Sequence, residues 1–507
     1  MKLINIMAFF PKMITSSFLL LLIFSCKKKL PEIPPTINSP TLISPANGSV
    51  MRDNAPFFDW SDVTGAVAYE IKVSSGMYNF SESTGVSEYQ PDRLRRDRNP
   101  YWPLQDGSYH WCVRARDSIG NWSDWSDEWQ FTVATIKWFY SSPDPTRSWA
   151  VCGPTLGLDG SIYAVFHPIY SQSYLLVALN PQGVEKWRLF LHNDTNTAIG
   201  VSCSYPIVGL DGTIYVSYND QPGYEYSTLA AISPGGTIKW ILPSGSPPYY
   251  DAEVKAIAED GSLICGGFTR FFCVDTNSSI KWIKPYGVKQ VAIGSNGNIF
   301  AISSGSGGVN ALLAFNSNGD LIWSKNIELY GISIAPNGTV VGVGSNLYAI
   351  DPNSGSILWQ QPYYGYSRAI ISDDNIIYVK CGDGLLHAFN IDGTLRWISD
   401  SLVSGGGPPP LLISRNGPII AEGFDEYGGA NGFCTYKLSL NGDIIQTYFL
   451  YYVADFIVAP DGTIYAGGVN RGPYAGGVCA IYGENIPDIQ NGWPMREHDA
   501  QRTNRAR

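Results

Sequence analysis

Residues 349–359, Ala-Ile-Asp-Pro-Asn-Ser-Gly-Ser-Ile-Leu-Trp, decide the fold of this chain. They join the end of an apolar strand to a polar turn with glycine and then to a second strand that carries tryptophan. The tryptophan recurs seven times, with Gln446 in an eighth slot: Trp138, Trp187, Trp240, Trp282, Trp323, Trp359 and Trp397. A turn of Asp-Gly or Asn-Gly type recurs eight times, at 159–160, 211–212, 260–261, 296–297, 337–338, 373–374, 416–417 and 461–462. Such self-similarity predicts eight copies of one supersecondary unit.

The order of the two series predicts how the repeats close. Trp138 precedes the first turn, and no equivalent tryptophan strand follows the turn at 461–462. We therefore predict that residues 136–139 form the missing outer strand of the last unit. This exchange would close a ring of β-sheets without a covalent bond and would leave no exposed sheet edge.

The repeats resemble those of quinoprotein-type, or PQQ-like, β-propellers. The tryptophan-docking signature of these propellers is Ala-x-Asp-x-x-Thr-Gly-x-x-x-Trp, and residues 349–359 match it with Ser354 in place of threonine. The resemblance covers residues 135–483 and implies an all-β, eight-bladed propeller closed by an N-terminal strand. The tail, residues 484–507, resembles segments found beside such propellers, and we expect it to pack on one face near the chain closure.

The N-terminal residues predict export and lipid anchoring. Lys2 and Lys12 precede an apolar stretch of about a dozen residues, which is typical of a signal peptide. Residues 22–26, Leu-Ile-Phe-Ser-Cys, resemble a bacterial lipobox, in which the cysteine is acylated. We predict a signal peptide over residues 1–25, a lipid on Cys26 and a proline-rich tether over 26–36. Lys27 follows Cys26 where some lipoproteins carry the Asp that retains them in the inner membrane, so the outer membrane is the preferred location.

A small β-sandwich is predicted for residues 37–134. Short runs of alternating apolar residues separated by turn residues indicate two packed sheets. The buried Trp60 and residues 115–123 resemble a fibronectin type III domain, and residues 122–126, Trp-Ser-Asp-Trp-Ser, resemble a motif of such domains in cytokine receptors. In those domains tryptophans interleave with arginines, and Arg114 and Arg116 lie where such a ladder needs them.

The cysteines leave two readings open. Eight remain if Cys26 is acylated, and an even number permits disulfides without assigning them. Cys265 and Cys273 flank one short loop and are the best candidates for a pair; buried free thiols are the alternative.

The composition argues against most enzyme classes and against nucleic-acid binding. The 507 residues carry a net charge of −10, so no molecule-wide basic face is available for phosphates. There are five histidines, no His-Glu-x-x-His and no Cys-x-x-Cys, so general-base and zinc chemistry lack their usual residues. We expect no catalytic residues and no metal.

A binding surface is predicted where the connections are longest. In each repeat the first and third turns are short, whereas the second connection and the link to the next repeat are long, and the long ones emerge on one face. Tyrosine on Gly/Pro-rich loops supplies rigid contact area for recognition. The predicted binding residues are Tyr170, Tyr224, Tyr226, Tyr249, Tyr250, Tyr363, Tyr364, Tyr366, Tyr427, Arg471 and Tyr474. The alternative is that these tyrosines only cover the blade ends.

Three functions follow from these features. The favoured one is a non-catalytic, lipid-anchored recognition or scaffold protein that binds a protein or glycan through the long loops. The second is a PQQ-dependent dehydrogenase, because the enzymes that these repeats resemble hold PQQ between a Trp and a disulfide of adjacent cysteines, with a calcium ion. The chain has no Cys-Cys dipeptide, so PQQ and calcium are disfavoured. The third is an outer-membrane assembly factor.

Overall fold

In the computed structural model every regular element within the described residues is a strand. The structure describes residues 37–76, 78–91, 102–142, 149–168, 173–192, 204–219, 228–242, 253–304, 311–362, 368–399, 411–413, 417–424, 433–448, 450, 453–468, 476–483, 499 and 506. Forty strands lie in these ranges. A search of the same ranges for a helix that could cross a bilayer found none.

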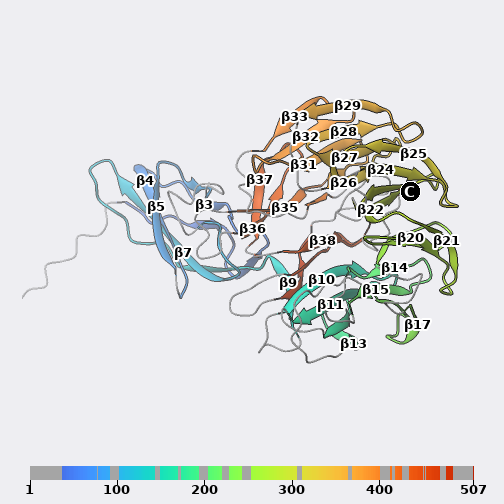
Figure 1. Cartoon of the computed structure of the whole chain (residues 1–507). Helices are drawn as coiled ribbons and strands as arrows, with labels where there is room; N and C mark the ends of the chain where they lie inside the picture. The colour runs from blue at the N-terminus through green and yellow to red at the C-terminus, as the bar shows by residue number, and fades with distance from the viewer. Residues whose placement is uncertain are drawn as a thin grey trace, which may run out of the picture.

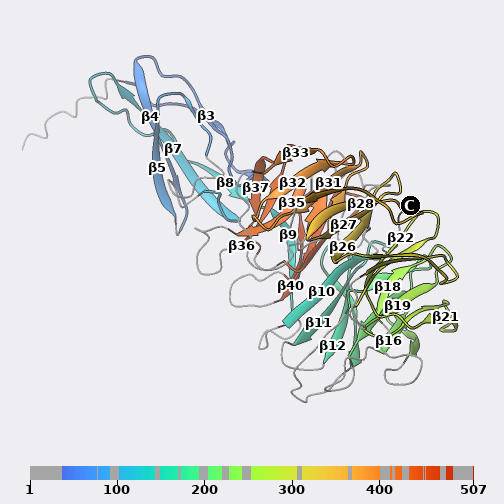
Figure 2. The ribbon, with the colours of Figure 1, turned by 45° about the horizontal axis from the view of Figure 1, so that its top comes forward.

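The first eight strands form two sheets packed face to face. One sheet has the order β1-β3-β6 and the other the order β2-β8-β7-β4-β5. Their bounds are β1 (Leu42–Ser44), β2 (Ser49–Met51), β3 (Phe58–Trp60), β4 (Ala66–Ser74), β5 (Asn79–Thr84), β6 (Glu88–Tyr89), β7 (Gly107–Asp117) and β8 (Trp129–Val133). Trp60, Trp111 and Phe131 are buried in one core between the sheets. This sandwich projects from the side of the larger unit, next to β37 (Figures 1 and 2).

The predicted arginine–tryptophan ladder is confirmed on the outer face of β7. The Arg114 guanidinium carbon lies 4.5 Å from the ring centroid of Trp122 and 4.6 Å from that of Trp125, and that of Arg116 lies 5.6 Å from Trp122. The intervening serines tie the segment to β7, because the backbone N–H of Ala115 donates to the Ser123 hydroxyl at 2.9 Å. The ladder is therefore part of the sandwich framework, as cation–π stacking between fixed partners implies.

Eight four-stranded antiparallel sheets follow within the described residues, and we number them sheets 1 to 8 in chain order. Sheet 1 contains β10 (Trp149–Leu156), β11 (Ile162–Pro168), β12 (Tyr174–Leu179) and β13 (Glu185–His192), and sheet 2 contains β14 (Ile207–Val208), β15 (Ile214–Tyr218), β16 (Thr228–Ile232) and β17 (Ile238–Leu242). Sheet 3 contains β18 (Val254–Ile257), β19 (Leu263–Gly266), β20 (Phe271–Val274) and β21 (Ile280–Lys284), and sheet 4 contains β22 (Val288–Ile293), β23 (Ile299–Ser303), β24 (Ala311–Phe315) and β25 (Leu321–Asn326).

Sheets 5 to 8 continue the same order, except that the last strand of sheet 8 comes from the start of the ring. Sheet 5 contains β26 (Leu329–Ile334), β27 (Val340–Gly344), β28 (Asn346–Ile350) and β29 (Ile357–Pro362), and sheet 6 contains β30 (Ile370–Ile371), β31 (Ile376–Lys380), β32 (Leu386–Asn390) and β33 (Leu395–Ile398). Sheet 7 contains β34 (Leu411–Ile413), β35 (Ile419–Phe424), β36 (Phe433–Leu438) and β37 (Ile444–Tyr448), and sheet 8 contains β38 (Asp455–Val458), β39 (Ile464–Gly467), β40 (Gly477–Ile481) and β9 (Ile136–Ser141).

The pairing of β9 with β40 confirms the predicted closure. The register aligns Trp138 with Ala480 and Ile136 with Ile481. The first strands of neighbouring sheets meet in sequence, and β38 in turn contacts β10, so the sheets close on themselves. We call the side with the first–second and third–fourth strand turns the short-turn face, and the other side the long-loop face.

Each repeat tryptophan connects its sheet to the next one. Six indole Nε1 groups, those of Trp138, Trp187, Trp240, Trp282, Trp323 and Trp359, donate to a turn carbonyl of the following sheet at 2.7–3.1 Å. The ring then lies flat on the turn glycine: a Cβ on Gly393 would stand 2.8 Å from Trp359. Gly393 also has a φ of +87°, which residues with side chains rarely adopt. Glycine is therefore required at this turn position for two reasons, the close contact with the tryptophan ring and the positive φ.

Two repeats depart from the sequence pattern. In sheet 6 the left-handed turn position is Asn375, with a φ of 59°, so the turn lies one residue beyond the predicted 373–374 pair. In the slot of the eighth tryptophan, Gln446 instead contacts the sandwich: its Nε2 donates to the carbonyl of Arg52 at 2.6 Å, and Asn54 Nδ2 donates to the carbonyl of Thr447 at 2.5 Å. The missing tryptophan therefore marks the place where the sandwich docks.

Of the two possibilities for Cys265 and Cys273, the structure confirms buried free thiols and excludes a disulfide between them. Cys265 faces Phe272 across the strand pair and Cys273 faces Ile264, so the two side chains point to opposite faces of sheet 3. Cys152, in β10, is the described cysteine that is disulfide-bonded.

Candidate functional site

The predicted binding residues and Cys26 lie outside the described residues, so the structure gives no positions for their side chains. It does describe the strands on either side of each predicted binding residue. Tyr170 lies between β11 and β12, and Tyr249 and Tyr250 lie between β17 and β18. Every such connection belongs to the long-loop face, as predicted from the turn spacing.

Long connections are confined to part of that face. Within and between sheets 3 to 5 most links are short: residues 267–270, 285–287, 327–328 and 345. The connections of eight residues or more are 193–206, 219–227, 243–253, 399–410, 425–432 and 468–476, and they belong to sheets 1, 2, 6, 7 and 8. Residues 304–310 in sheet 4 and 363–369 after sheet 5 have an intermediate length of seven residues. The side of the ring nearest the closure thus carries most of the loop material.

A buried polar bridge lies beneath these loops and joins sheets 6, 7 and 8. Lys380 Nζ, at the end of β31, donates to the backbone carbonyl of Glu422 in β35 at 2.8 Å. The Glu422 carboxylate accepts the backbone N–H of Val453, which precedes β38, at 3.1 Å. Burial raises the pKa of Glu422 to about 7 and lowers that of Lys380 to about 8, despite their mutual attraction. The bridge therefore links the long-loop ends of β31 and β35 to the segment that precedes β38.

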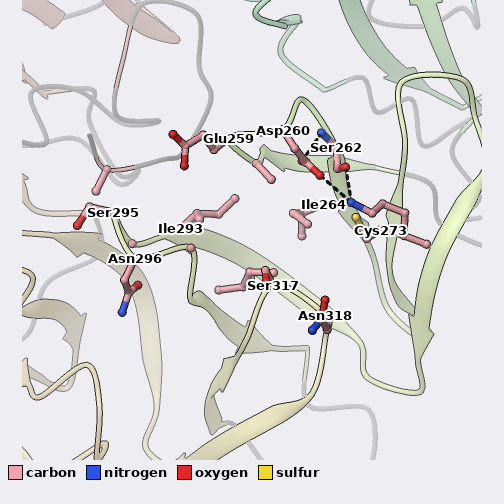
Figure 3. A pocket seen from close by; sticks show the side chains of 16 residues that line it. Glu259, Asp260, Ser262, Ile264, Cys273, Ile293, Ser295, Asn296, Ser317 and Asn318 are labelled. Carbon is pink, nitrogen blue, oxygen red and sulfur yellow. Dashed lines mark hydrogen bonds and ion pairs between the residues drawn. The ribbon is translucent and has the colours of Figure 1, made fainter.

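A cavity of about 680 Å³ opens on the opposite, short-turn face between sheets 3 and 4 (Figure 3). Its walls are the turns between the first two strands of each sheet and the third–fourth turn of sheet 4. The lining is mostly polar or small: Ala258, Glu259, Asp260, Ser262, Ile264, Cys273, Lys281, Ile293, Gly294, Ser295, Asn296, Gly297, Ile299, Ser317, Asn318 and Ala506.

The charges of this cavity are already paired. Lys281 Nζ lies 2.7 Å from Asp260 Oδ2 and donates to the Ser262 hydroxyl at 3.1 Å. Burial raises the pKa of Asp260, but the bonds from Lys281 and Ser262 outweigh it and hold the pKa below its usual value. The bond to Asp260 raises the pKa of Lys281. Burial raises the pKa of the Cys273 thiol to about 11, so it stays protonated and is a weak nucleophile. These groups suit polar binding better than acid–base chemistry near neutrality.

The Asp260–Lys281 pair is a repeat feature rather than a unique site. Lys186 pairs with Asp159 at 2.9 Å in sheet 1, and Lys239 with Asp211 at 3.2 Å in sheet 2. The signal was present in the sequence, because a lysine directly precedes the tryptophan in every repeat whose turn between the first and second strands reads Asp-Gly followed by Ser or Thr. The pair was not among the predicted site residues, and its recurrence indicates a brace between strands.

Ala506, one of the two described residues of the tail, lines this cavity and does not lie near the chain closure. The expected packing of the tail as a whole stays a prediction, because its other residues apart from Asp499 lie outside the described residues. The backbone N–H of Ala506 donates to the carbonyl of Ile293 at 2.8 Å, and its methyl joins the core of sheets 4 and 5. Sheet 4 lies across the ring from sheet 8, where closure occurs. A free backbone amide and a small methyl suffice for this contact, so sequence pattern gave no guide to it.

The described residues do not fit a quinone cofactor. Six repeat tryptophans are committed to hydrogen bonds between sheets, and Trp397 packs on Gly442. The sequence has no adjacent cysteines to complete a stacking site.

One protein-family model matches the repeats. The family model described as "Outer membrane protein assembly factor BamB" matches residues 148–361 and 307–423. BamB from Moraxella catarrhalis is 18% identical with a TM-score of 0.40, covering 56% of this chain and 83% of its own. A quinonprotein alcohol dehydrogenase-like protein from Bacteroides thetaiotaomicron is 10% identical with a TM-score of 0.37, covering 81% of this chain and 96% of its own.

Virginiamycin B lyase from Staphylococcus aureus is 12% identical with a TM-score of 0.39, covering 56% of this chain and 93% of its own. No curated protein sequence matches this chain significantly. The two segments of the family match together span just over half of the chain. The chain therefore belongs to the family of PQQ-type β-propeller repeats whose model is described as outer membrane protein assembly factor BamB.

Proposed function

We propose that this chain is a non-catalytic, lipid-anchored protein of the bacterial cell envelope that binds a protein or glycan partner. The eight sheets are the blades of one propeller over residues 135–483, the sandwich over 37–134 is a fibronectin type III-like spacer, and the long loops form the binding surface. The observation that carries the proposal is the contrast between two faces: uniform tight turns on one, and long connections of varied length on the other.

The framework under the long loops is rigid enough to present them. Tryptophan hydrogen bonds link neighbouring sheets, and the Lys380–Glu422 bridge ties sheets 6, 7 and 8 beneath the loops. Binding residues carried on loops over such a scaffold are positioned without large entropic cost. Tyr249 and Tyr250 belong to the long connection 243–253, and Tyr363 and Tyr364 belong to the shorter connection 363–369.

The paired charges of the cavity support a binding role over catalysis. Asp260 and Lys281 neutralise each other, and the Cys273 thiol has a raised pKa, so the cavity holds no activated nucleophile. A dehydrogenase is accordingly disfavoured, with PQQ and calcium as its cofactors. An outer-membrane assembly factor is now the second candidate, because the family model carries that description and such a factor also works by binding other proteins.

The anchor belongs to the same proposal. Acylation of Cys26 would place Lys27, Lys28 and Lys29 against lipid headgroups. Residues 30–35 would then separate the sandwich from the membrane. The outer membrane is the preferred location.

The test is affinity capture from an envelope extract. Replacing Tyr249, Tyr250, Tyr363 and Tyr364 with Ala removes aromatic anchors, each worth about 1–4 kcal/mol in a recognition surface. We expect partner capture to fall at least tenfold while the melting temperature stays within a few degrees.

The matched control replaces Gln182 and Asn318 with Ala on the short-turn face. Asn318 lines the cavity, so the control also examines that site. Normal capture by the tyrosine variant together with loss in the control would place the working surface on the short-turn face.

A further inference from the structure

One turn on the long-loop face gathers three side chains of different metal-ligand types. Cys381 directly follows β31, Asp383 lies in the β31–β32 turn, and His387 is in β32. One potential ligand atom from each, the Sγ, a carboxylate oxygen and a ring nitrogen, lies within 4.8 Å of the others. Within the described part of the chain, no other group of three such residues meets this condition.

The backbone holds this turn in a fixed shape. The N–H of Cys381 donates to the carbonyl of Leu385, and the N–H of Gly384 donates to the carbonyl of Cys381, each at 2.9 Å. Gly384 has a φ of +82°, which the tight return of the chain requires. The three side chains are therefore positioned before any ligand arrives.

The strand register brings them to one face of sheet 6. His387 is paired with Val379, and Cys381 lies two residues beyond Val379, so the thiol and the imidazole share a face. Asp383 Oδ1 accepts the N–H of Leu385 at 2.9 Å, which leaves Oδ2 2.9 Å from His387 Nε2. The carboxylate is thus oriented toward the other two groups.

We propose that Cys381, Asp383 and His387 form a binding site for a divalent transition-metal ion of the zinc type. A thiolate with an imidazole and a carboxylate suits Zn²⁺ and Co²⁺, whereas Mg²⁺ and Ca²⁺ prefer oxygen ligands alone. Cys381 and His387 are 6% and 9% exposed, while the Asp383 side chain is 47% exposed. The site therefore has two buried ligands and one side open to solvent, where water or a group from a partner would complete a tetrahedral shell.

This inference is independent of the proposed binding function, because it rests on one turn of sheet 6 and not on the long tyrosine loops. The ordinary alternative is an Asp–His hydrogen bond beside an unrelated thiol. Metal binding would require Cys381 to lose its proton, so the affinity should rise with pH, whereas a hydrogen-bonded pair alone would bind no metal.

The experiment titrates CoCl₂ into the untagged, chelator-treated chain from Cys26 onward. The expected result is one Co²⁺ per chain, with the visible absorption of tetrahedral cobalt and a near-ultraviolet sulfur-to-cobalt charge-transfer band, and displacement of Co²⁺ by Zn²⁺. Cys381→Ser should abolish the charge-transfer band, and Asp383→Asn should weaken Co²⁺ binding at least tenfold. Cys434→Ser, which removes another buried free thiol, is the matched control and should change neither.

Folding is checked by circular dichroism for each variant, and Asp383→Asn on the exposed turn keeps the test valid if Cys381→Ser unfolds. Two results would overturn the site: no stoichiometric Co²⁺ binding by the folded chain, or a charge-transfer band that persists in Cys381→Ser. Binding lost equally in Cys434→Ser would also overturn it, because the effect would then come from general destabilisation.

Discussion

The guanidinium carbon of Arg52 lies 3.5 Å from the ring centroid of Tyr482, across the boundary between the sandwich and sheet 8. Arg52 also donates from Nη1 to the carbonyl of Ala134 at 2.8 Å, and its own carbonyl accepts from Gln446. One residue of the sandwich thus contacts the linker and two sheets. Stacking of an arginine on tyrosine with this set of hydrogen bonds fixes the angle between the sandwich and the propeller sheets.

Arg52→Ala combined with Gln446→Ala should release the sandwich. We expect the maximum dimension in small-angle X-ray scattering to increase and protease cleavage near residue 134 to accelerate several-fold. The reason is the loss of the stacking on Tyr482 and of the hydrogen bonds to Ala134 and from Gln446. Arg116→Ala, which removes a similar cation–π contact inside the sandwich, is the control. Unchanged scattering and cleavage in the double variant would mean that other contacts hold the joint.

The tryptophan bonds between sheets should be measurable one at a time. Trp359→Phe keeps most of the packing but loses the 2.7 Å bond to the carbonyl of Ile391, which should cost about 1 kcal/mol. Trp359→Ala should cost about 3 kcal/mol because it also leaves a gap on Gly393. Denaturant unfolding followed by fluorescence gives both values, and equal effects of the two changes would show that the hydrogen bond, not the packing, dominates.

Closure by β9 should be essential, whereas the sandwich should not be. A chain that begins at Ser142 lacks β9 and leaves β40 with unpaired backbone groups. We expect it to aggregate or to melt far below a chain that begins at Thr135, which keeps β9. Similar melting temperatures for the two chains, measured by calorimetry, would contradict the closure.

The Lys380–Glu422 bridge should make stability depend on pH. The pKa of Glu422 is raised in the folded state to about 7, so its contribution favours folding at low pH and is lost as pH rises from about 4.5 to 7. The Glu422→Gln change keeps an acceptor for Val453 but cannot ionise. Its stability relative to the unchanged chain should therefore increase over this range, by up to about 3 kcal/mol.

The contribution of Lys380 to folding stability depends on pH in the opposite direction. Its pKa is lowered to about 8 when folded, so its contribution is present at high pH and is lost as pH falls from about 10.5 to 8. Urea unfolding of both forms between pH 4 and 9 tests the Glu422 effect. A constant difference across that range would show that Glu422 ionises normally.

The lipid anchor is tested by fractionation. Cys26→Ala should move the chain from the membrane to the soluble fraction, because under the proposal the acyl chains on this residue are the membrane anchor. Retention of the Cys26→Ala variant in the membrane after a high-salt wash would show that another element anchors it.

The sequence by itself determined the repeat, the closing strand and the arginine–tryptophan ladder. Each depends on local periodicity: Trp359 and Gly355 recur at fixed offsets, and Arg114 and Arg116 alternate along one strand, so spacing alone predicts which face they share. The sequence also showed Gln446 in the eighth tryptophan position, but it did not predict the hydrogen bond from Gln446 to the carbonyl of Arg52.

The tertiary structure alone decided which residues from distant repeats meet. Cys265 and Cys273 are close in sequence, yet the strand register turns them to opposite faces and rules out the expected disulfide. Arg52 and Tyr482, and Ala506 and Ile293, meet only because the sheets close and the sandwich and the tail then pack on particular sheets. Periodicity fixes neighbours within a strand or a turn, whereas contacts between separate surfaces follow from packing over the whole molecule, which no local pattern encodes.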